Sequence, residues 1–397
     1  MRRRRRSVTK RELLLLRVLE YISQEGHAPR AEIARALKLS KATVTHITRD
    51  LIDHGIAAEV ADLPDTQDLN TSSGRPSVPL QVNPDAGLLI GIDLSGSRVA
   101  AVVLNMALAQ HVRLEFEHPA LRHSALPQDL VSSVVDGIMT TLGPDSARVR
   151  GIGISVRALN YQVDDTGDAR LMDVKANAAL VDALITQHRI PVAVIHNMQA
   201  LLLAEMMRRP SSGLRLLIHV GEGIGGAIWL ENKPIEGAHL AAGEWGHITV
   251  DRNGPVCACG KRGCIEASYA VPHLVERART HDPRVTSWED FVAHVDAPAC
   301  QAILHEFIEA AAHALSGPVL VCDPEEIIVD GPICDVADAF LPQFSQALAE
   351  ELLPRTRRAL TLTTSMGGVD TAARGAAYSL IGKALEHMVT TPLVLKP

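Results

Sequence analysis

The chain has 397 residues, of which 47% are hydrophobic and 3% aromatic, and its formal net charge is −7. This length suffices for two or three domains, and the scarcity of aromatic side chains argues against a protein that binds single-stranded nucleic acid by base stacking. The charge is uneven, because residues 1–60 carry 13 Lys and Arg against 7 Asp and Glu, whereas the other 337 residues carry 26 against 39. A basic head on an acidic body suggests that only the head binds a polyanion.

The sequence predicts neither a membrane span nor a secretory signal. Its longest apolar candidate, residues 310–322, is too short for a span and contains His313. The arginines at positions 2–6 precede polar residues rather than an apolar segment, and they are either phosphate contacts or a solvated tail. We therefore expect a cytoplasmic protein with reduced cysteines and no membrane insertion.

Helical spacing of apolar residues predicts three helices in the basic head, at residues 10–24, at residues 30–37 and after Ser40, which is a suitable N-cap. The buried stripe of the third helix is expected to be Val44, Ile47, Leu51 and Ile52. Its opposite face carries Lys41, Thr43, Thr45, His46 and Arg49.

Two helices joined by a short turn, the second with a polar exposed face, are typical of a helix-turn-helix that reads the major groove of double-stranded DNA. A three-helix packing module without DNA is the alternative, and the basic charge favours DNA binding. Residues 56–61 and 78–82 then predict a hairpin, or wing, with a polar tip at residues 63–76. Arg75, between Gly74 and Pro76, suits a narrow minor groove, although by itself it would be an ordinary surface arginine.

The body is predicted to be a mixed α/β structure. Strands are expected at residues 88–93, 98–104, 112–116, 148–156 and 326–330, and helices at residues 129–142, 271–279, 288–295, 301–315, 340–353 and 372–388. The isolated cysteines Cys300, Cys322 and Cys334 are expected to be buried.

Three cysteines, Cys257, Cys259 and Cys264, fall within eight positions, and His247 lies ten residues upstream. Three thiolates and one imidazole complete a tetrahedral set for Zn²⁺ and leave no position for a catalytic water, so a structural zinc is predicted. The alternative is three unbound cysteines in a glycine-rich loop, because the spacing differs from the common pair of C-x2-C motifs.

The segment at residues 244–266, E-W-G-H followed by G-P-x-C-x-C-G-x-x-G-C-I-E, resembles the zinc signature of the ROK family. This family contains bacterial sugar kinases and sugar-responsive repressors of the NagC/Mlc/XylR type, and the resemblance spans most of the chain. It implies a winged helix-turn-helix at residues 1–83 and a two-lobed, actin-like (ribonuclease-H-like) ATPase fold with an inserted zinc site. Lobe 1 would comprise residues 84–195 with 372–397, and lobe 2 residues 196–371. In the repressors of this family a similar G-R-P lies beside the DNA.

The motifs that the resemblance assigns to phosphoryl transfer are altered here. The first turn, D-x-G-x-T in kinases, is D-L-S-G-S at residues 93–97, and G-x-G-x-P-G-P ends instead in Val156 and Arg157. The catalytic Asp of N-D-x-N is replaced by Asn197, which accepts no proton at neutral pH. The chain is therefore expected not to be an enzyme.

The nucleotide side is altered as well. The second glycine-rich turn, residues 221–226, has Glu222 where kinases have Thr, and its carboxylate would repel phosphates. Gly331 is followed by Pro332, where kinases often have paired glycines against adenine. ATP binding is therefore not expected.

The sugar contacts implied by the resemblance are kept. They are Glu244, His247 and Glu266, with Asn197 as a further candidate. Zinc on one nitrogen of His247 would direct the other toward the ligand; alternatively, the carboxylates only support the metal.

Together these features predict a transcriptional regulator, specifically a repressor of carbohydrate genes, that binds an operator and responds to a sugar or phosphosugar. A homodimer or higher oligomer is expected, because paired recognition helices bind a palindrome. The alternatives are a repressor sequestered by a sugar-transporter protein and a ROK kinase that retains phosphoryl transfer.

Overall fold

The computed structural model describes residues 10–60, 78–95, 98–117, 128–157, 162–163, 169–170, 174–209, 211–231, 233–239 and 241–390. The chain divides into two compact units. Unit 1 comprises Met1–Val156, Lys175–Ile195 and Ala376–Pro397, and unit 2 comprises Arg157–Val174 and His196–Gly375.

The N-terminal head, residues 10–60 and 78–82 of unit 1, is a winged helix-turn-helix. It contains α1 (Lys10–Glu25), α2 (Arg30–Ala36) and α3 (Lys41–Asp53), and a sheet of order β1-β3-β2 formed by Ala28–Pro29, Pro79–Val82 and Ala57–Glu59. The three predicted helices and the two wing strands are confirmed, whereas β1 was not predicted. The wing tip with Arg75 and the arginines at positions 2–6 lie outside the described residues.

Helix α3 begins as predicted, because Oγ of Ser40 accepts a hydrogen bond of 3.0 Å from the main-chain N–H of Thr43. The predicted buried stripe is wrong at one position, since Ile52 is half-buried and Thr48 is completely buried instead. Arg30 explains the exchange: its Nε donates to Oγ1 of Thr48 at 3.0 Å and so satisfies the buried hydroxyl.

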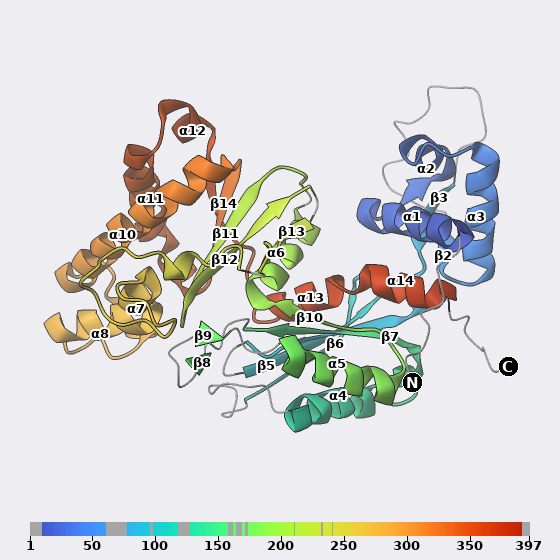
Figure 1. Ribbon diagram of the computed structural model, residues 1–397, viewed down its shortest axis with the longest axis horizontal. Helices are drawn as coiled ribbons and strands as arrows, with labels where there is room; N and C mark the ends of the chain where they lie inside the picture. Colours follow the sequence, from blue (N-terminus) through green and yellow to red (C-terminus); the bar gives the residue numbers. More distant parts are fainter. Residues whose placement is uncertain are drawn as a thin grey trace. The chain divides into compact units, whose positions relative to one another are not determined.

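Unit 1 also contains a five-stranded mixed sheet of order β10-β7-β4-β5-β6. The strands are β4 (Leu88–Asp93), β5 (Arg98–Asn105), β6 (Gln110–Glu117), β7 (Val149–Val156) and β10 (Val192–His196). Helices α4 (Gln128–Leu142) and α5 (Val174–His188) cover one face (Figure 1). Both contribute apolar side chains to the core of the sheet, including Val135 and Leu184.

The predicted C-terminal helix is two helices, α13 (Thr371–Tyr378) and α14 (Ile381–Thr390). At the break, the main-chain N–H of Leu380 donates to Ala377 at 3.2 Å, three residues back, and Oγ of Ser379 donates to the carbonyl oxygen of Ala376 at 2.7 Å. Helix α14 packs against β7 of the sheet and against α1 of the head. Gly153 of β7 permits the close approach of α13, because a Cβ there would lie 1.9 Å from the carbonyl oxygen of Ala376.

Unit 2 is built on a second five-stranded sheet, of order β13-β12-β11-β14-β15. Its strands are β11 (Arg215–Val220), β12 (Ile224–Leu230), β13 (Lys233–Ile235), β14 (Glu326–Asp330) and β15 (Thr361–Thr364). β11 is antiparallel to β12 and parallel to β14, which is parallel to β15. The carboxyl ends of β11, β14 and β15 therefore share one edge of the sheet.

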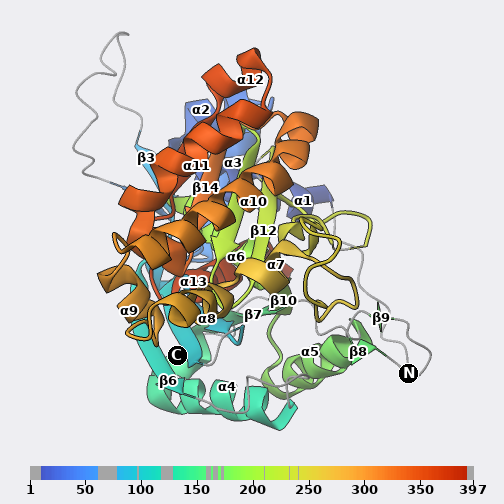
Figure 2. The same cartoon turned by 90° about the vertical axis from the view of Figure 1, so that its left-hand side faces the viewer.

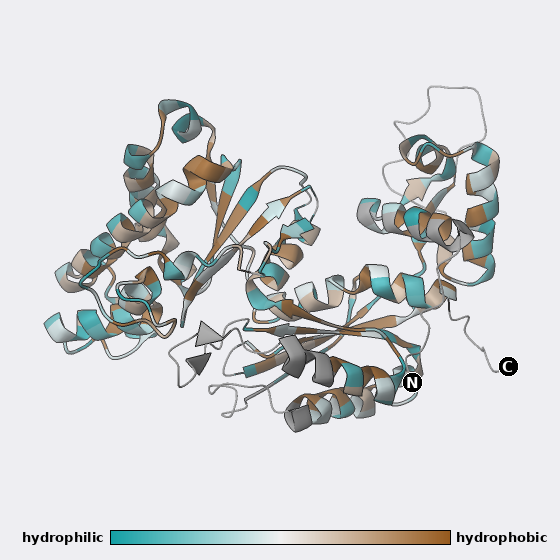
Figure 3. Ribbon diagram, viewed as in Figure 1, coloured by the Kyte–Doolittle hydropathy of each residue, from teal (hydrophilic) through white to brown (hydrophobic). Residues whose placement is uncertain are grey.

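Helices cover both faces of this sheet, α10 (Pro298–Cys322) and α11 (Ala337–Glu351) on one and α6 (Asn197–Arg208) on the other (Figures 1 and 2). The residues of β11 alternate accordingly: Leu216 and Ile218 pack with α10 and α11, and Leu217 packs with α6. Figure 3 shows the resulting hydrophobic strands between more polar helices.

Helix α10 was predicted to end near Leu315 but extends to Cys322 through Pro318. It ends at Asp323, whose left-handed φ of 49° turns the chain out of the helix. Cys300 is buried, whereas Cys322 and Cys334 are half-buried rather than buried.

The remaining elements of unit 2 are α7 (Ile265–Tyr269), α8 (Val271–His281), α9 (Trp288–Ala293), α12 (Pro354–Ala359), β8 (Gln162–Val163) and β9 (Ala169–Arg170). No helix among the described residues is long and apolar enough to cross a membrane.

Candidate functional site

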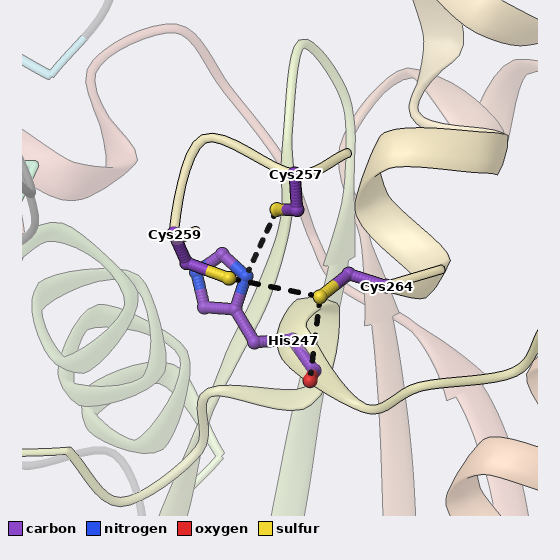
Figure 4. Close-up of side chains that lie close together, drawn as sticks. All are labelled: His247, Cys257, Cys259 and Cys264. Carbon is purple, nitrogen blue, oxygen red and sulfur yellow. Dashed lines mark hydrogen bonds between the residues drawn. The ribbon is translucent and has the colours of Figure 1, made fainter. Parts of the chain in front are cut away.

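The predicted metal ligands converge on one point in unit 2. The ligand atoms of His247, Cys257, Cys259 and Cys264 all lie within 4.8 Å of one another (Figure 4). Sγ of Cys257 lies 3.6 Å from Nδ1 of His247, and Sγ of Cys259 lies 3.7 Å from Sγ of Cys264. Three sulfur atoms and one nitrogen at this separation fit the donor set of a closed tetrahedral site.

The loop that carries the cysteines depends on two glycines with positive φ, Gly260 at 83° and Gly263 at 74°. A Cβ on Gly263 would lie 1.4 Å from the carbonyl oxygen of Asp251, so no other residue fits there. The turn is closed by a main-chain hydrogen bond of 2.8 Å from Cys257 to Lys261. This backbone conformation brings the sulfur atoms of Cys259 and Cys264 to the same side of the loop.

Burial changes the protonation of these side chains. Burial raises the pKa of the Cys264 thiol to about 12 and also raises the pKa of Cys257. Burial lowers the pKa of His247, which favours the neutral imidazole that metals bind. The cluster is thus able to bind a metal ion, which would displace the thiol protons.

His247 connects the cysteine cluster to the carboxylates predicted to bind sugar. Its Nδ1 faces the cysteines, and its Nε2 lies 3.7 Å from Oε2 of Glu244. Burial and the neighbouring carboxylate of Glu266 raise the pKa of Glu244 to about 7. The structure therefore brings Glu244, His247 and Glu266 together, and their binding of sugar stays a prediction.

Glu266 also holds the glycine-rich turn. Its Oε2 accepts a hydrogen bond of 2.9 Å from the main-chain N–H of Ile224. A Cβ on Gly223 would lie 2.8 Å from the same oxygen, so the turn backbone packs directly against the carboxylate. One oxygen of Glu266 thus already has a main-chain donor.

Asn197 is the first residue of α6 and is 8% exposed. The residue before it, His196, is a member of the site that the sequence analysis missed. Its Nδ1 accepts from the main-chain N–H of Met198 at 3.2 Å, and its Nε2 lies 3.7 Å from Oε1 of Glu244. The available signal was its position, since His196 occupies the Asn position of the kinase N-D pair.

The chemistry of His196 follows from this cap. Burial lowers the pKa of His196 to about 4, so the ring is neutral near pH 7. Because Nδ1 accepts a hydrogen bond, the single ring proton lies on Nε2. His196 therefore presents a neutral N–H donor toward Glu244.

Two positions that differ from the kinase motifs form an ion pair. Nη2 of Arg157 lies 3.6 Å from Oε2 of Glu222, and both side chains are more than half exposed. Arg157 replaces part of the Pro-Gly turn, and Glu222 replaces the Thr of the glycine-rich turn. Because both side chains are largely exposed, Arg157 offsets only part of the charge of Glu222.

The residues predicted to contact DNA lie on α3 of the head. Lys41, Thr45, His46 and Arg49 are exposed, and Thr43 is half-buried. The hydroxyl of Thr43 lies 2.7 Å from that of Ser40, and the Thr45 hydroxyl donates to the Lys41 carbonyl at 2.8 Å. Arg75 lies outside the described residues. Four of the five side chains of α3 that were predicted to contact DNA are thus on the surface, and Thr43 contributes mainly to the cap.

Comparison with known proteins agrees with this architecture. Residues 89–383 match the model of the ROK family, and residues 11–57 match that of a winged helix-turn-helix DNA-binding domain. The xylose repressor of Bacillus spizizenii is 23% identical over 380 residues, which cover 93% of this chain and 95% of the repressor. The transcriptional dual regulator NagC of Escherichia coli is 25% identical over 384 residues, which cover 93% of this chain and 92% of NagC.

Solved structures share the fold. A ROK family transcriptional regulator, a homologue of the Escherichia coli Mlc protein, has a TM-score of 0.76 at 22% identity and covers 96% of this chain and 98% of its own. A ROK glucokinase from Streptomyces griseus, solved with glucose and AMPPNP, has a TM-score of 0.57 at 21% identity and covers 74% of this chain and 99% of its own. The kinase alignment thus leaves about a quarter of the chain unmatched. Because the ROK model spans well over half of the 397 residues, the chain belongs to the ROK family and carries a winged helix-turn-helix at its N-terminus.

Proposed function

We propose that this protein is a transcriptional repressor of carbohydrate uptake or metabolism genes, controlled by a sugar or phosphosugar that binds its ROK body. The observation that carries the proposal is the exposed polar face of α3 in a winged helix-turn-helix fused to that body. Relatives that align over nearly the whole chain are named as a xylose repressor and as the regulator NagC, which supports the same function here.

On the DNA side, α3 would enter the major groove of a double-stranded operator. Lys41 and Arg49 supply cationic donors, and Thr45 and His46 supply polar groups for base edges or phosphates. Thr43 and Arg75 complete the predicted set, Arg75 by reaching the minor groove. A homodimer or higher oligomer would place two such helices on a palindrome.

On the effector side, Glu244, His247 and Glu266 form the proposed sugar-binding wall, with Asn197 beside it. Carboxylates accept hydrogen bonds from sugar hydroxyls, and the imidazole adds a polar atom at a fixed orientation. His196 adds a neutral N–H donor next to Glu244. Acceptors and donors on one wall suit a polyhydroxylated ligand.

We assign the metal as Zn²⁺, held by His247, Cys257, Cys259 and Cys264. Its role would be structural, because four protein ligands leave no open position on a tetrahedral ion. The ion would fix the cysteine loop and the ring orientation of His247, and thereby the wall that this ring shares.

The same site argues against phosphoryl transfer. Asn197 replaces the carboxylate that would take the proton of the attacking hydroxyl, and an amide cannot act as that base. Glu222 adds negative charge to the turn that would face phosphates. The ROK body would therefore act as a cytoplasmic sensor rather than as a kinase.

Control of DNA binding requires that the effector bind the DNA-competent and DNA-incompetent conformations with different affinities. The test is operator binding by the purified protein to the DNA upstream of its own gene, with a panel of sugars and phosphosugars. Release by one compound is the expected result. DNA binding that no compound alters would contradict effector control. It would favour the second candidate, a repressor that is sequestered by a sugar-transporter protein. A pull-down with transporter domains tests this candidate.

A further inference from the structure

One imidazole lies between the two turns that correspond to the nucleotide-binding turns of ROK kinases. These turns are residues 221–223, after β11, and Gly331–Pro332, after β14. They share an edge, because β11 and β14 are parallel neighbours. In open α/β sheets a ligand binds outside the carboxyl ends of the strands, which is this edge. The imidazole belongs to His219, the penultimate residue of β11.

His219 is held by a buried carboxylate. Its Nδ1 lies 2.6 Å from Oδ2 of Asp330, the last residue of β14, and Oγ of Ser365 donates to Oδ1 of Asp330 at 2.5 Å. Ser365 follows β15 and is itself fixed by a main-chain hydrogen bond of 2.7 Å to Val329. We call these three side chains the strand-end clamp, because they connect the ends of β11, β14 and β15.

The carboxylate in this clamp is ionised at neutral pH. Asp330 is 6% exposed, and burial alone would raise its pKa, but the hydrogen bonds and charge of His219 and the bond from Ser365 lower it. A buried carboxylate with both oxygens engaged fixes its partners firmly. The imidazole of His219 is therefore held in one orientation.

The imidazole lies against both turns, with 23% of the side chain exposed. A Cβ on Gly221 would lie 2.7 Å from Nε2 of His219, and a Cβ on Gly331 would lie 2.9 Å from its Cε1. The same Cβ on Gly221 would lie 3.3 Å from Cδ of Pro332, so the turns also approach each other. A nucleotide base or phosphate would have to displace the ring, which Asp330 holds.

We propose that His219 occupies the niche in which ROK kinases hold a nucleotide, and that the strand-end clamp joins the three strand ends without one. His219 excludes the nucleotide. Its contacts with Asp330 and with both turns hold this edge of the sheet together in place of the nucleotide. The chain thereby loses nucleotide binding through a filled niche, in addition to the charge of Glu222. This role of His219 depends neither on DNA binding nor on the identity of the effector.

Two sets of substitutions distinguish filling of the niche from simple loss of nucleotide contacts. If Glu222 and Pro332 alone prevented binding, restoring the kinase-like residues at these two positions would restore affinity. If His219 fills the niche, affinity returns only when the ring is also removed. Asn at position 219 is the suitable replacement, because its amide N–H can still donate to Asp330 while the outer half of the ring is gone.

The test compares three full-length proteins: the unaltered chain, Glu222→Thr/Pro332→Gly, and Glu222→Thr/Pro332→Gly/His219→Asn. Binding of a fluorescent ADP analogue in the presence of Mg²⁺ is measured by anisotropy, and zinc content and the thermal unfolding curve verify that each protein is folded. We expect no detectable binding by the first two proteins. The third is expected to bind at least about tenfold more tightly than the detection limit that applies to the second, a difference of about 1.4 kcal/mol or more.

Binding by the unaltered chain, equal binding by the double and triple variants, or no binding by a folded triple variant would each overturn the proposal. If the triple variant does not fold, the variant Glu222→Thr/Pro332→Gly/His219→Ala/Asp330→Asn replaces it, since it removes both the ring and the buried charge. Its control is Glu222→Thr/Pro332→Gly/Asp330→Asn, which keeps the ring. The same tenfold difference between these two proteins is expected, and equal affinities would again refute the role of His219.

Discussion

Glu244 and His247 face each other at 3.7 Å, Oε2 to Nε2, while the other nitrogen of the His247 ring lies 3.6 Å from Sγ of Cys257. One imidazole is therefore part of both the cysteine cluster and the proposed sugar wall. Anything that reorients this ring changes both, so metal content and effector affinity should vary together.

Removal of the metal should accordingly reduce both stability and effector binding. We expect Cys259→Ser to lose the ion and to destabilise the fold by several kcal/mol, because structural zinc supplies folding free energy. Metal analysis of the purified protein and thermal unfolding with and without a chelator measure this. Cys322→Ser is the matched control, since Cys322 is a half-buried cysteine outside the cluster and its loss should leave one metal ion per chain. Equal metal content in the two variants would contradict the assignment.

Glu244→Gln should weaken the effector without unfolding the protein. Removing a carboxylate that accepts hydrogen bonds from ligand hydroxyls costs about 1–3 kcal/mol, or roughly tenfold or more in affinity. Isothermal titration with the compound that releases DNA provides the measurement. Glu236→Gln, at an exposed position, is the control and should bind as the unaltered chain does. Undiminished affinity in Glu244→Gln would remove Glu244 from the sugar wall.

The parts of the fold that were predictable from sequence are those that local chemistry determines. The start of α3 followed from a single N-cap residue, Ser40, and the metal cluster followed from residue types at short spacing, with Cys257 and Cys264 only seven residues apart. Both signals lie within one turn or loop, so no tertiary information was needed.

The parts that were missed depend on contacts between distant segments or on competition between similar local structures. His219 and Asp330 are separated by 111 residues and meet only because β11 and β14 pair in register. The break between α13 and α14 is a local tightening of the main chain at Leu380, and the spacing of apolar residues does not reveal it. The burial of Thr48 in place of Ile52 likewise requires Arg30 from another helix.

Restoring the catalytic carboxylate should not restore a kinase. In Asn197→Asp the proton acceptor returns, but the strand-end clamp and Glu222 still oppose nucleotide binding, so no phosphorylated sugar is expected. A coupled ADP-release assay with the sugar panel tests this, with the unaltered chain as the baseline. Turnover above that baseline would show that the nucleotide side is functional and would contradict the inferred role of His219.

Substitutions on α3 should affect DNA affinity according to the contact that is lost. Lys41→Ala and Arg49→Ala should each weaken operator binding. The loss is about 1–3 kcal/mol where a base contact is removed. Where a phosphate contact is removed, the slope of log K against log salt concentration should fall in magnitude by about one. Fluorescence anisotropy at several salt concentrations measures both quantities. Arg17→Ala removes an exposed arginine of α1 and is the charge-matched control. If this control weakened binding as much as Arg49→Ala does, the effect would reflect net charge rather than a contact of α3.

His196 should make folding stability depend on pH between about 5 and 7. Burial lowers its pKa to about 4, below the ordinary value of 6.5, so in this range the unfolded chain takes up a proton that the folded chain does not. Stability therefore falls as the pH falls below 6.5, and by pH 5 this one group contributes a loss of about 2 kcal/mol. His196→Gln should remove this part of the dependence, since its amide does not titrate. Denaturant unfolding at pH 7.5 and pH 5 measures the loss of stability in each protein. Other titrating groups contribute equally to this loss in both proteins, so the difference between the two losses is the contribution of His196. An equal loss of stability in the two proteins would show that His196 is protonated as easily in the folded chain as in the unfolded one. The assignment of His196 as a neutral donor to the sugar-binding wall would then be wrong.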